Sequence, residues 1–129
     1  MEDPDLHLMD ERGRRIRAAR RNGRIWVFLI PGQIRLLRLV SLLCAESAMA
    51  GGAPCGVLVG KMTFFDSDRS IAITAHCDQA ALDGWGSKTG AASRWTTGNA
   101  LLPLGERTMA GPGVLSIEIL SDGPYLAAD

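Results

Sequence analysis

The stretch Asn22-Gly23-Arg24-Ile25-Trp26-Val27-Phe28-Leu29-Ile30-Pro31-Gly32 decides the fold class of this chain. Asn-Gly is the dipeptide that most favours a tight turn between antiparallel strands. The residues after Arg24 are apolar at every position up to Pro31-Gly32, which ends the run. Because such a run is apolar on both faces, it predicts a central strand of a β-sheet.

Outward from this strand, short apolar runs are separated by glycine and polar turns. Residues 115–119 alternate between apolar and polar side chains, which is typical of a half-buried strand. Residues 57–65 predict another strand, in which Gly60 marks a bulge or a close approach. Residues 42–50 have good helix propensity and could form one short helix. We expect residues 1–129 to form a single, mostly β domain, a small β-sandwich or open barrel of about seven short strands.

The charge distribution argues against nucleic acid as a partner. The formal net charge is zero, although residues 1–40 carry +4 and residues 41–129 carry −4. A nucleic-acid-binding domain is normally basic overall, and we interpret the arginines between residues 12 and 24 as a solvated hairpin face. No run of roughly 18 apolar residues predicts a membrane span. No N-terminal signal peptide is recognised, and no compartment is indicated.

Residues that carry chemistry are few. His7 and His76 are the two histidines, and we expect both to be exposed. Ser70, His76 and Asp78 are close in sequence, but the serine lacks the glycine turn that presents a catalytic nucleophile. The cysteines and histidines also lack the spacing of a zinc site. We therefore expect no enzymatic activity, no metal and no cofactor, with a small hydrolase-like enzyme that uses His76 as a remote alternative.

Two tryptophans lie in a loop-rich region that is poor in aliphatic residues. Indole rings offer sugars a flat apolar surface, and nearby polar side chains can bind hydroxyl groups. This pattern predicts a candidate glycan-binding site; the alternative is that both indoles fill the core. The candidate residues are Trp85, Arg94, Trp95, Thr96 and Asn99.

Three stretches resemble a β-rich accessory module that follows Hint (hedgehog/intein-type) domains in bacterial proteins and accompanies some glycosyltransferases. The chain departs from the family where Gly86, Ser87 and Lys88 replace a histidine and a glutamate, and where residues 48–56 replace a polar segment. The matching stretches are Asp3-Pro4-Asp5-Leu6-His7-Leu8 with Gly13-Arg14-Arg15-Ile16; Trp26-Val27-Phe28-Leu29-Ile30-Pro31 with Leu37-Arg38-Leu39-Val40-Ser41; and Gly84-Trp85 with Arg94-Trp95-Thr96-Thr97-Gly98-Asn99-Ala100.

The resemblance implies a non-catalytic accessory β-sandwich that recognises glycans or a cell surface. A different hypothesis comes from the strand pattern itself. If residues 115–120 formed an exposed sheet edge, the chain could pair with a second copy or with a partner protein as an assembly module.

Overall fold

The computed structural model describes residues 3–32, 34–44, 55–66, 69–88, 92–105, 111–121 and 124–126, with residues 87 and 88 described by their backbone only. In these ranges the chain is mostly β, as predicted, with more strands than expected. Its elements are β1 (His7–Met9), β2 (Arg15–Arg17), β3 (Arg20–Asn22), β4 (Ile25–Ile30), β5 (Leu36–Val40), β6 (Leu58–Asp66), β7 (Arg69–Ile73), α2 (Ala75–Asp78), β8 (Trp85–Lys88), β9 (Arg94–Thr96), β10 (Asn99–Pro103) and β11 (Gly113–Ile119).

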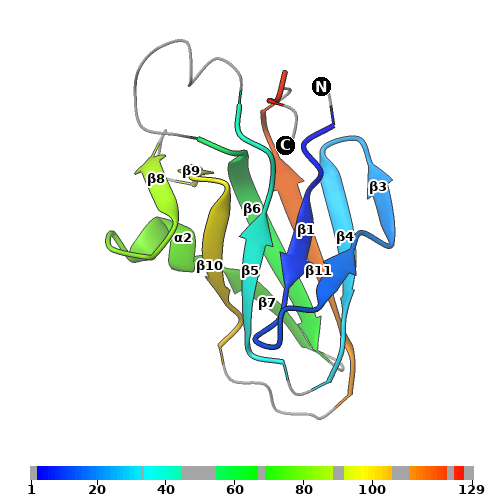
Figure 1. Cartoon of the computed structure of the whole chain (residues 1–129). Helices are drawn as coiled ribbons and strands as arrows, with labels where there is room; N and C mark the ends of the chain where they lie inside the picture. Colours follow the sequence, from blue (N-terminus) through cyan, green and yellow to red (C-terminus); the bar gives the residue numbers. More distant parts are fainter. Residues whose placement is uncertain are drawn as a thin grey trace.

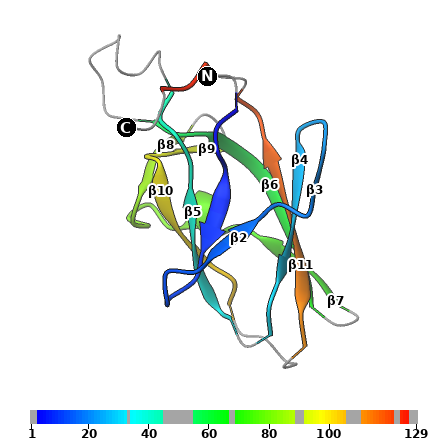
Figure 2. The ribbon, with the colours of Figure 1, turned by 45° about the vertical axis from the view of Figure 1, so that its right-hand side comes forward.

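The strands form two antiparallel sheets that lie one over the other (Figures 1 and 2). The four-stranded sheet has the order β10-β5-β1-β2. The seven-stranded sheet has the order β3-β4-β11-β6-β9-β8, and β7 also pairs with β6. Of the two predicted architectures, the sandwich is therefore the one observed.

One hydrophobic core fills the space between the sheets. Strands β4, β6 and β11 of the larger sheet contribute alternate side chains to it, as the two-residue period of a strand requires. The larger sheet supplies Trp26, Phe28, Ile30, Met62, Phe64, Leu115, Ile117 and Ile119, and the smaller sheet supplies Leu8, Leu37, Leu39, Ala100 and Leu102.

Strand β11 lies in the middle of the larger sheet, between β4 and β6. The hypothesis that residues 115–120 form an exposed edge is therefore wrong, because both sides of β11 are hydrogen-bonded. The predicted irregularity at Gly60 is confirmed: the β11–β6 register shifts between Ile117 and Ile119. A Cβ at Gly60 would also lie 2.3 Å from Glu118 Oε1, so the two strands approach closely there.

The single described helix, α2, was not predicted from the sequence. The helix predicted near residues 42–50 is absent from residues 42–44, and residues 45–50 lie outside the described ranges. Both histidines are buried rather than exposed, with His7 at 5% and His76 at 2% relative accessibility.

Gly84 allows β8 to approach the start of β10. Its φ is +79°, and a Cβ there would lie 2.0 Å from the Asn99 carbonyl oxygen. Gly23, in the β3–β4 turn, has a φ of +61° but no atom within 4 Å of its Cβ position.

We predict that Gly84→Ala lowers the free energy of unfolding by about 2–5 kcal/mol, because backbone strain and a steric clash add. Gly23→Ala is the matched control. It should lower the free energy of unfolding by about 1–2 kcal/mol, because only the backbone strain applies there. Urea unfolding of the two variants measures both effects. Equal losses would mean that Gly84 is needed for its φ alone.

Candidate functional site

Trp85 belongs to the interior of the sandwich. It is 7% exposed, and its indole N–H donates a hydrogen bond of 2.7 Å to the Leu101 carbonyl oxygen. On its ring lies the imidazole of His76, with the two centroids 5.3 Å apart. His76 Nε2 in turn lies 2.8 Å from the Gly60 carbonyl oxygen, so this nitrogen donates its proton there. These contacts connect α2 to β6 and β8 of the larger sheet, and β8 to β10 of the smaller sheet.

Arg94 is also buried, at 5% relative accessibility. All the acceptors of its described hydrogen bonds are backbone carbonyl groups. Nε donates to Gly86, Nη1 donates to His76 and Gln79, and Nη2 donates to Ala80, at distances between 2.7 and 3.2 Å. The planar guanidinium therefore satisfies carbonyls of α2, of the turn after it and of β8 at once.

The five predicted site residues do not form one exposed surface. Thr96 is 1% exposed, and its hydroxyl oxygen accepts hydrogen bonds from the amides of Val57 and Gly98. Trp85, Arg94 and Thr96 thus face the interior, which corrects their prediction as a ligand-binding surface. The half-buried side chain of Trp95 extends from the face of β9 opposite to Arg94 and Thr96. Asn99 is exposed and belongs to β10 of the four-stranded sheet.

The largest exposed apolar side chains instead lie on the solvent side of β4 and β6, which we call the outer face of the seven-stranded sheet. Leu29 is 59% exposed and Phe65 is 50% exposed. Val114 of β11 pairs with both, opposite Leu29 on one side and Phe65 on the other. Directly paired residues extend their side chains from the same face, so these three form one continuous apolar row.

The outer face continues on both sides of this row. Ile25 and Val27 extend it along β4, with Ile25 37% exposed. At the far end, Trp95 pairs with the half-buried Leu58. Between these apolar groups lies Glu118, whose Oε1 accepts a hydrogen bond of 3.2 Å from the Lys61 amide. The apolar character of both faces of residues 25–30 was visible in the sequence, but it predicted burial on both sides.

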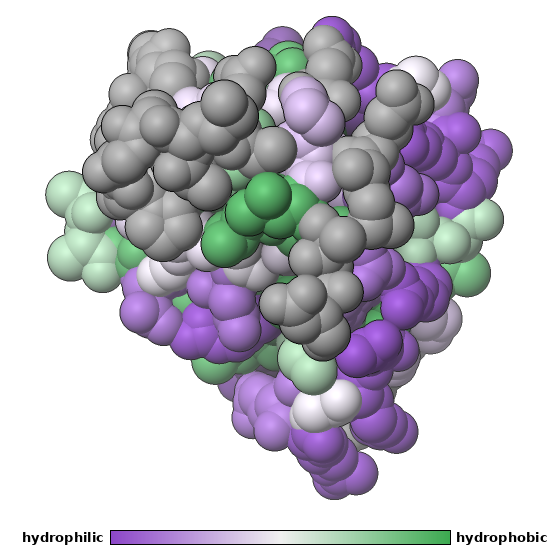
Figure 3. Space-filling model, turned by 45° about the horizontal axis from the view of Figure 1, so that its top comes forward, coloured by the Kyte–Doolittle hydropathy of each residue, from purple (hydrophilic) through white to green (hydrophobic). Residues whose placement is uncertain are grey.

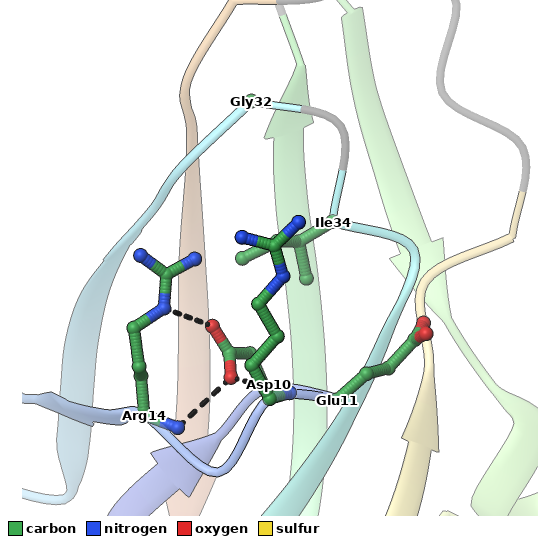
Figure 4. Close-up of a pocket in the computed structure, with 6 residues that line it drawn as sticks. Asp10, Glu11, Arg14, Gly32 and Ile34 are labelled. Atoms are coloured by element: carbon green, nitrogen blue, oxygen red, sulfur yellow. Dashed lines mark hydrogen bonds and ion pairs between the residues drawn. The ribbon is translucent and has the colours of Figure 1, made fainter.

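A pocket of about 300 Å³ lies beside the turn between β1 and β2 (Figure 4). Within it the Asp10 carboxylate stabilises the turn. Its Oδ1 accepts hydrogen bonds of 2.9 Å from the backbone amides of Arg12 and Arg14, and its Oδ2 accepts one of 3.0 Å from Nε of Arg14. Glu11 and Arg12 add one charge of each sign. Because Arg14 is paired with Asp10, the lining has no net excess of either charge.

Among the described residues, no group of three or more His, Cys, Asp or Glu side chains lies close enough to hold a metal ion. No helix in those ranges is long and apolar enough to cross a membrane.

No protein-family model matches the chain, and neither a curated protein nor a solved structure gives a match.

We predict that Arg94→Lys lowers the free energy of unfolding by about 3 kcal/mol or more. Lysine lacks the planar fork that reaches four carbonyl groups, and hydrogen bonds to a charged donor contribute about 1.5–3 kcal/mol each. Arg35→Lys is the control, because Arg35 is exposed. Thermal and urea unfolding give the comparison. Similar stability of the two variants would contradict the structural role of Arg94.

The turn at Asp10 gives a pH-dependent prediction. The hydrogen bond from the Arg14 amide, helped by the Arg12 amide and the Arg14 guanidinium, lowers the pKa of Asp10 below its usual value of 3.8. Folding therefore favours the ionised carboxylate. The stabilisation is fully present above the usual pKa and is lost as the pH falls through the lowered folded-state pKa.

We predict that Asp10→Asn is less stable than the unmodified chain at neutral pH and that the difference disappears under acidic conditions. Urea unfolding at a series of pH values measures it. A stability difference that persists unchanged at acidic pH would show that the charge of Asp10 is not what stabilises the turn.

Proposed function

We propose that the chain is a non-catalytic accessory module that associates with a second copy of itself through the outer face of the seven-stranded sheet. The observation that carries this proposal is the apolar row in which the half-buried Val114 lies between the exposed Leu29 and Phe65. Monomeric proteins rarely leave contiguous large apolar side chains in water, and such patches are typical of interaction surfaces.

The order of side chains along the row favours a second copy as the occupant. A large residue lies at each end, Leu29 and Phe65, and the smaller Val114 lies between them. A two-fold axis through Val114 would place Leu29 of each copy against Phe65 of the other. Such an interface is self-complementary, as two-fold symmetry requires, and two sheets packed face to face bury side chains efficiently.

The size of the surface suggests weak and reversible association. The outer face offers roughly a dozen side chains, whereas a standard stable interface uses about 20–30 residues on each side. Next to the apolar row along β11, Ser116 and Glu118 place polar groups within the outer face, which further limits its apolar area. We expect a dimer that forms as the concentration rises from micromolar to millimolar.

The accessory role is supported by the resemblance to the Hint-associated module and by the lack of a recognisable catalytic motif in the sequence. A glycan-binding role through Trp85, Arg94, Trp95, Thr96 and Asn99 has less support, because three of these side chains are interior. Among them, Trp95 lies on the outer face and Asn99 is exposed.

Charge substitutions in the row test the proposal. We predict that Leu29→Lys alone and Phe65→Glu alone each abolish self-association, because each places two unpaired charges in an apolar interface. Combining Leu29→Lys with Phe65→Glu should restore the dimer, since two-fold pairing then joins opposite charges across it. Sedimentation velocity over a concentration series measures the association.

Leu126→Lys is the matched control, because Leu126 is 39% exposed but does not belong to the outer face. It should associate like the unmodified chain. A strict monomer at millimolar concentration, or a dimer unaffected by both single substitutions, would contradict the proposal.

A further inference from the structure

A step one strand wide lies beside β7 at the edge of the seven-stranded sheet. A strand has two hydrogen-bonding edges, and β11 pairs along one edge of β6, so β7 and β9 share the other. Beyond β9 the sheet continues with β8, whereas β7 pairs with β6 alone (Figure 2). The part of the sheet that contains β7 is therefore one strand narrower on this side than the part that contains β8.

The register of β7 shows which of its backbone groups face the step. Arg69 pairs with Asp66, with two residues between them, and the pair that closes such a short hairpin is hydrogen-bonded. Because hydrogen-bonded and non-hydrogen-bonded pairs alternate along the ladder, Ser70 and Ala72 direct their N–H and C=O groups away from β6. Both residues are exposed, and no described residue hydrogen-bonds to these backbone groups. Donors and acceptors thus lie in a line along the free edge of β7.

Three other edge strands, β2, β3 and β10, carry groups that obstruct the addition of a further strand. β2 and β3 are rich in arginine, and hydrophilic residues gather on the right-hand side of Figure 3, where Figure 1 draws β3 and β4. On β10, the Leu101 amide and carbonyl are already bonded to Asp83 and Trp85. β7 has one arginine, at its first residue, and contains neither lysine nor proline. Since proteins commonly protect edge strands with such groups, the open edge of β7 is suited to pairing with another chain.

We propose that the free edge of β7 binds one extended segment of a partner protein, which adds to the sheet as a strand antiparallel to β7. Another extended backbone presents donors and acceptors at the spacing that satisfies Ser70 and Ala72 together. The step is one strand wide, so a single added strand fills it level with β8. A second folded copy fits the step less well, because β8 projects beyond β7 on the same side of β6.

The side chains beside the edge define the chemistry of the segment. On the outer face, Ser70 and Ala72 are small, and the pair partner of Ser70 is Phe65, which is 50% exposed. On the opposite side of β7, Ile71 is half-buried. A segment rich in β-branched residues covers these groups on both faces. Arg69 is exposed at the start of β7 and favours an acidic residue near the C-terminal end of an antiparallel segment.

An NMR titration of the ¹⁵N-labelled full chain tests the proposal. The probe is a capped synthetic peptide of about six residues, the usual length of a strand, in which valine and threonine alternate before a final glutamate. We expect the backbone amide signals of Ser70 and Ala72 to shift downfield and saturate, because both gain hydrogen bonds. The same peptide with two central prolines should leave both signals unmoved. The edge does not require the outer-face association, and a micromolar chain concentration keeps that association low.

A pair of variants at one position separates the backbone contact from the side chain. Ala72→Pro removes an outward N–H without taking a hydrogen bond from the ladder between β6 and β7. It should weaken peptide binding about tenfold or more, because an edge hydrogen bond is lost and the ring occupies its place. Ala72→Val is the matched control, which keeps the N–H and should change the affinity little. Circular dichroism checks that both variants are folded, and the shifts of the unmodified chain test the edge independently of them.

Saturable downfield shifts of Ser70 and Ala72, lost in Ala72→Pro and kept in Ala72→Val, would support the proposal. It would be overturned by the absence of saturable shifts at these two amides, by saturable shifts confined to other strands, or by equal affinities of the two folded variants. Shifts of the same amides that grow with chain concentration in the absence of peptide would also overturn it, and would assign the edge to a second copy.

Discussion

The pairing of β11 with β4 and β6 fixes both faces of the larger sheet at once. In this register Leu115, Ile117 and Ile119 enter the core, while Val114 joins Leu29 and Phe65 on the solvent side. Because side chains alternate along a strand, a slip by one residue would exchange the two sets and place polar groups in the core. The burial of the inner residues therefore stabilises the same arrangement that exposes the apolar row.

The region around α2 depends on a different kind of interaction. Residues 75–88 contain few large aliphatic side chains, and buried polar contacts hold them on the sandwich instead. Arg94 binds four backbone carbonyl groups, Trp85 donates to Leu101, and Gly84 permits the close approach to β10. Buried polar groups stabilise a fold only when they are satisfied, so these residues act as a unit.

Local patterns predicted the strands at residues 25–30 and 115–119, the irregularity at Gly60 and the mostly β fold. They could not predict which strands lie at an edge, because pairing joins segments far apart, such as Val114 with Leu29. Arg94 and Trp85 were candidate ligand-binding residues for the same reason. Their acceptors, including the carbonyls of His76 and Leu101, become neighbours only in the folded chain. An apolar run likewise does not say whether its second face is covered by the protein or by a partner.

Association with a second copy through the apolar row on the outer side of β4 is the central claim. The most direct test is an isotope-filtered NOE experiment on an equimolar mixture of labelled and unlabelled chain at millimolar concentration. The account predicts intermolecular NOEs between the Leu29 methyl groups and the Phe65 ring. Their absence, in a sample shown to be dimeric, would contradict it.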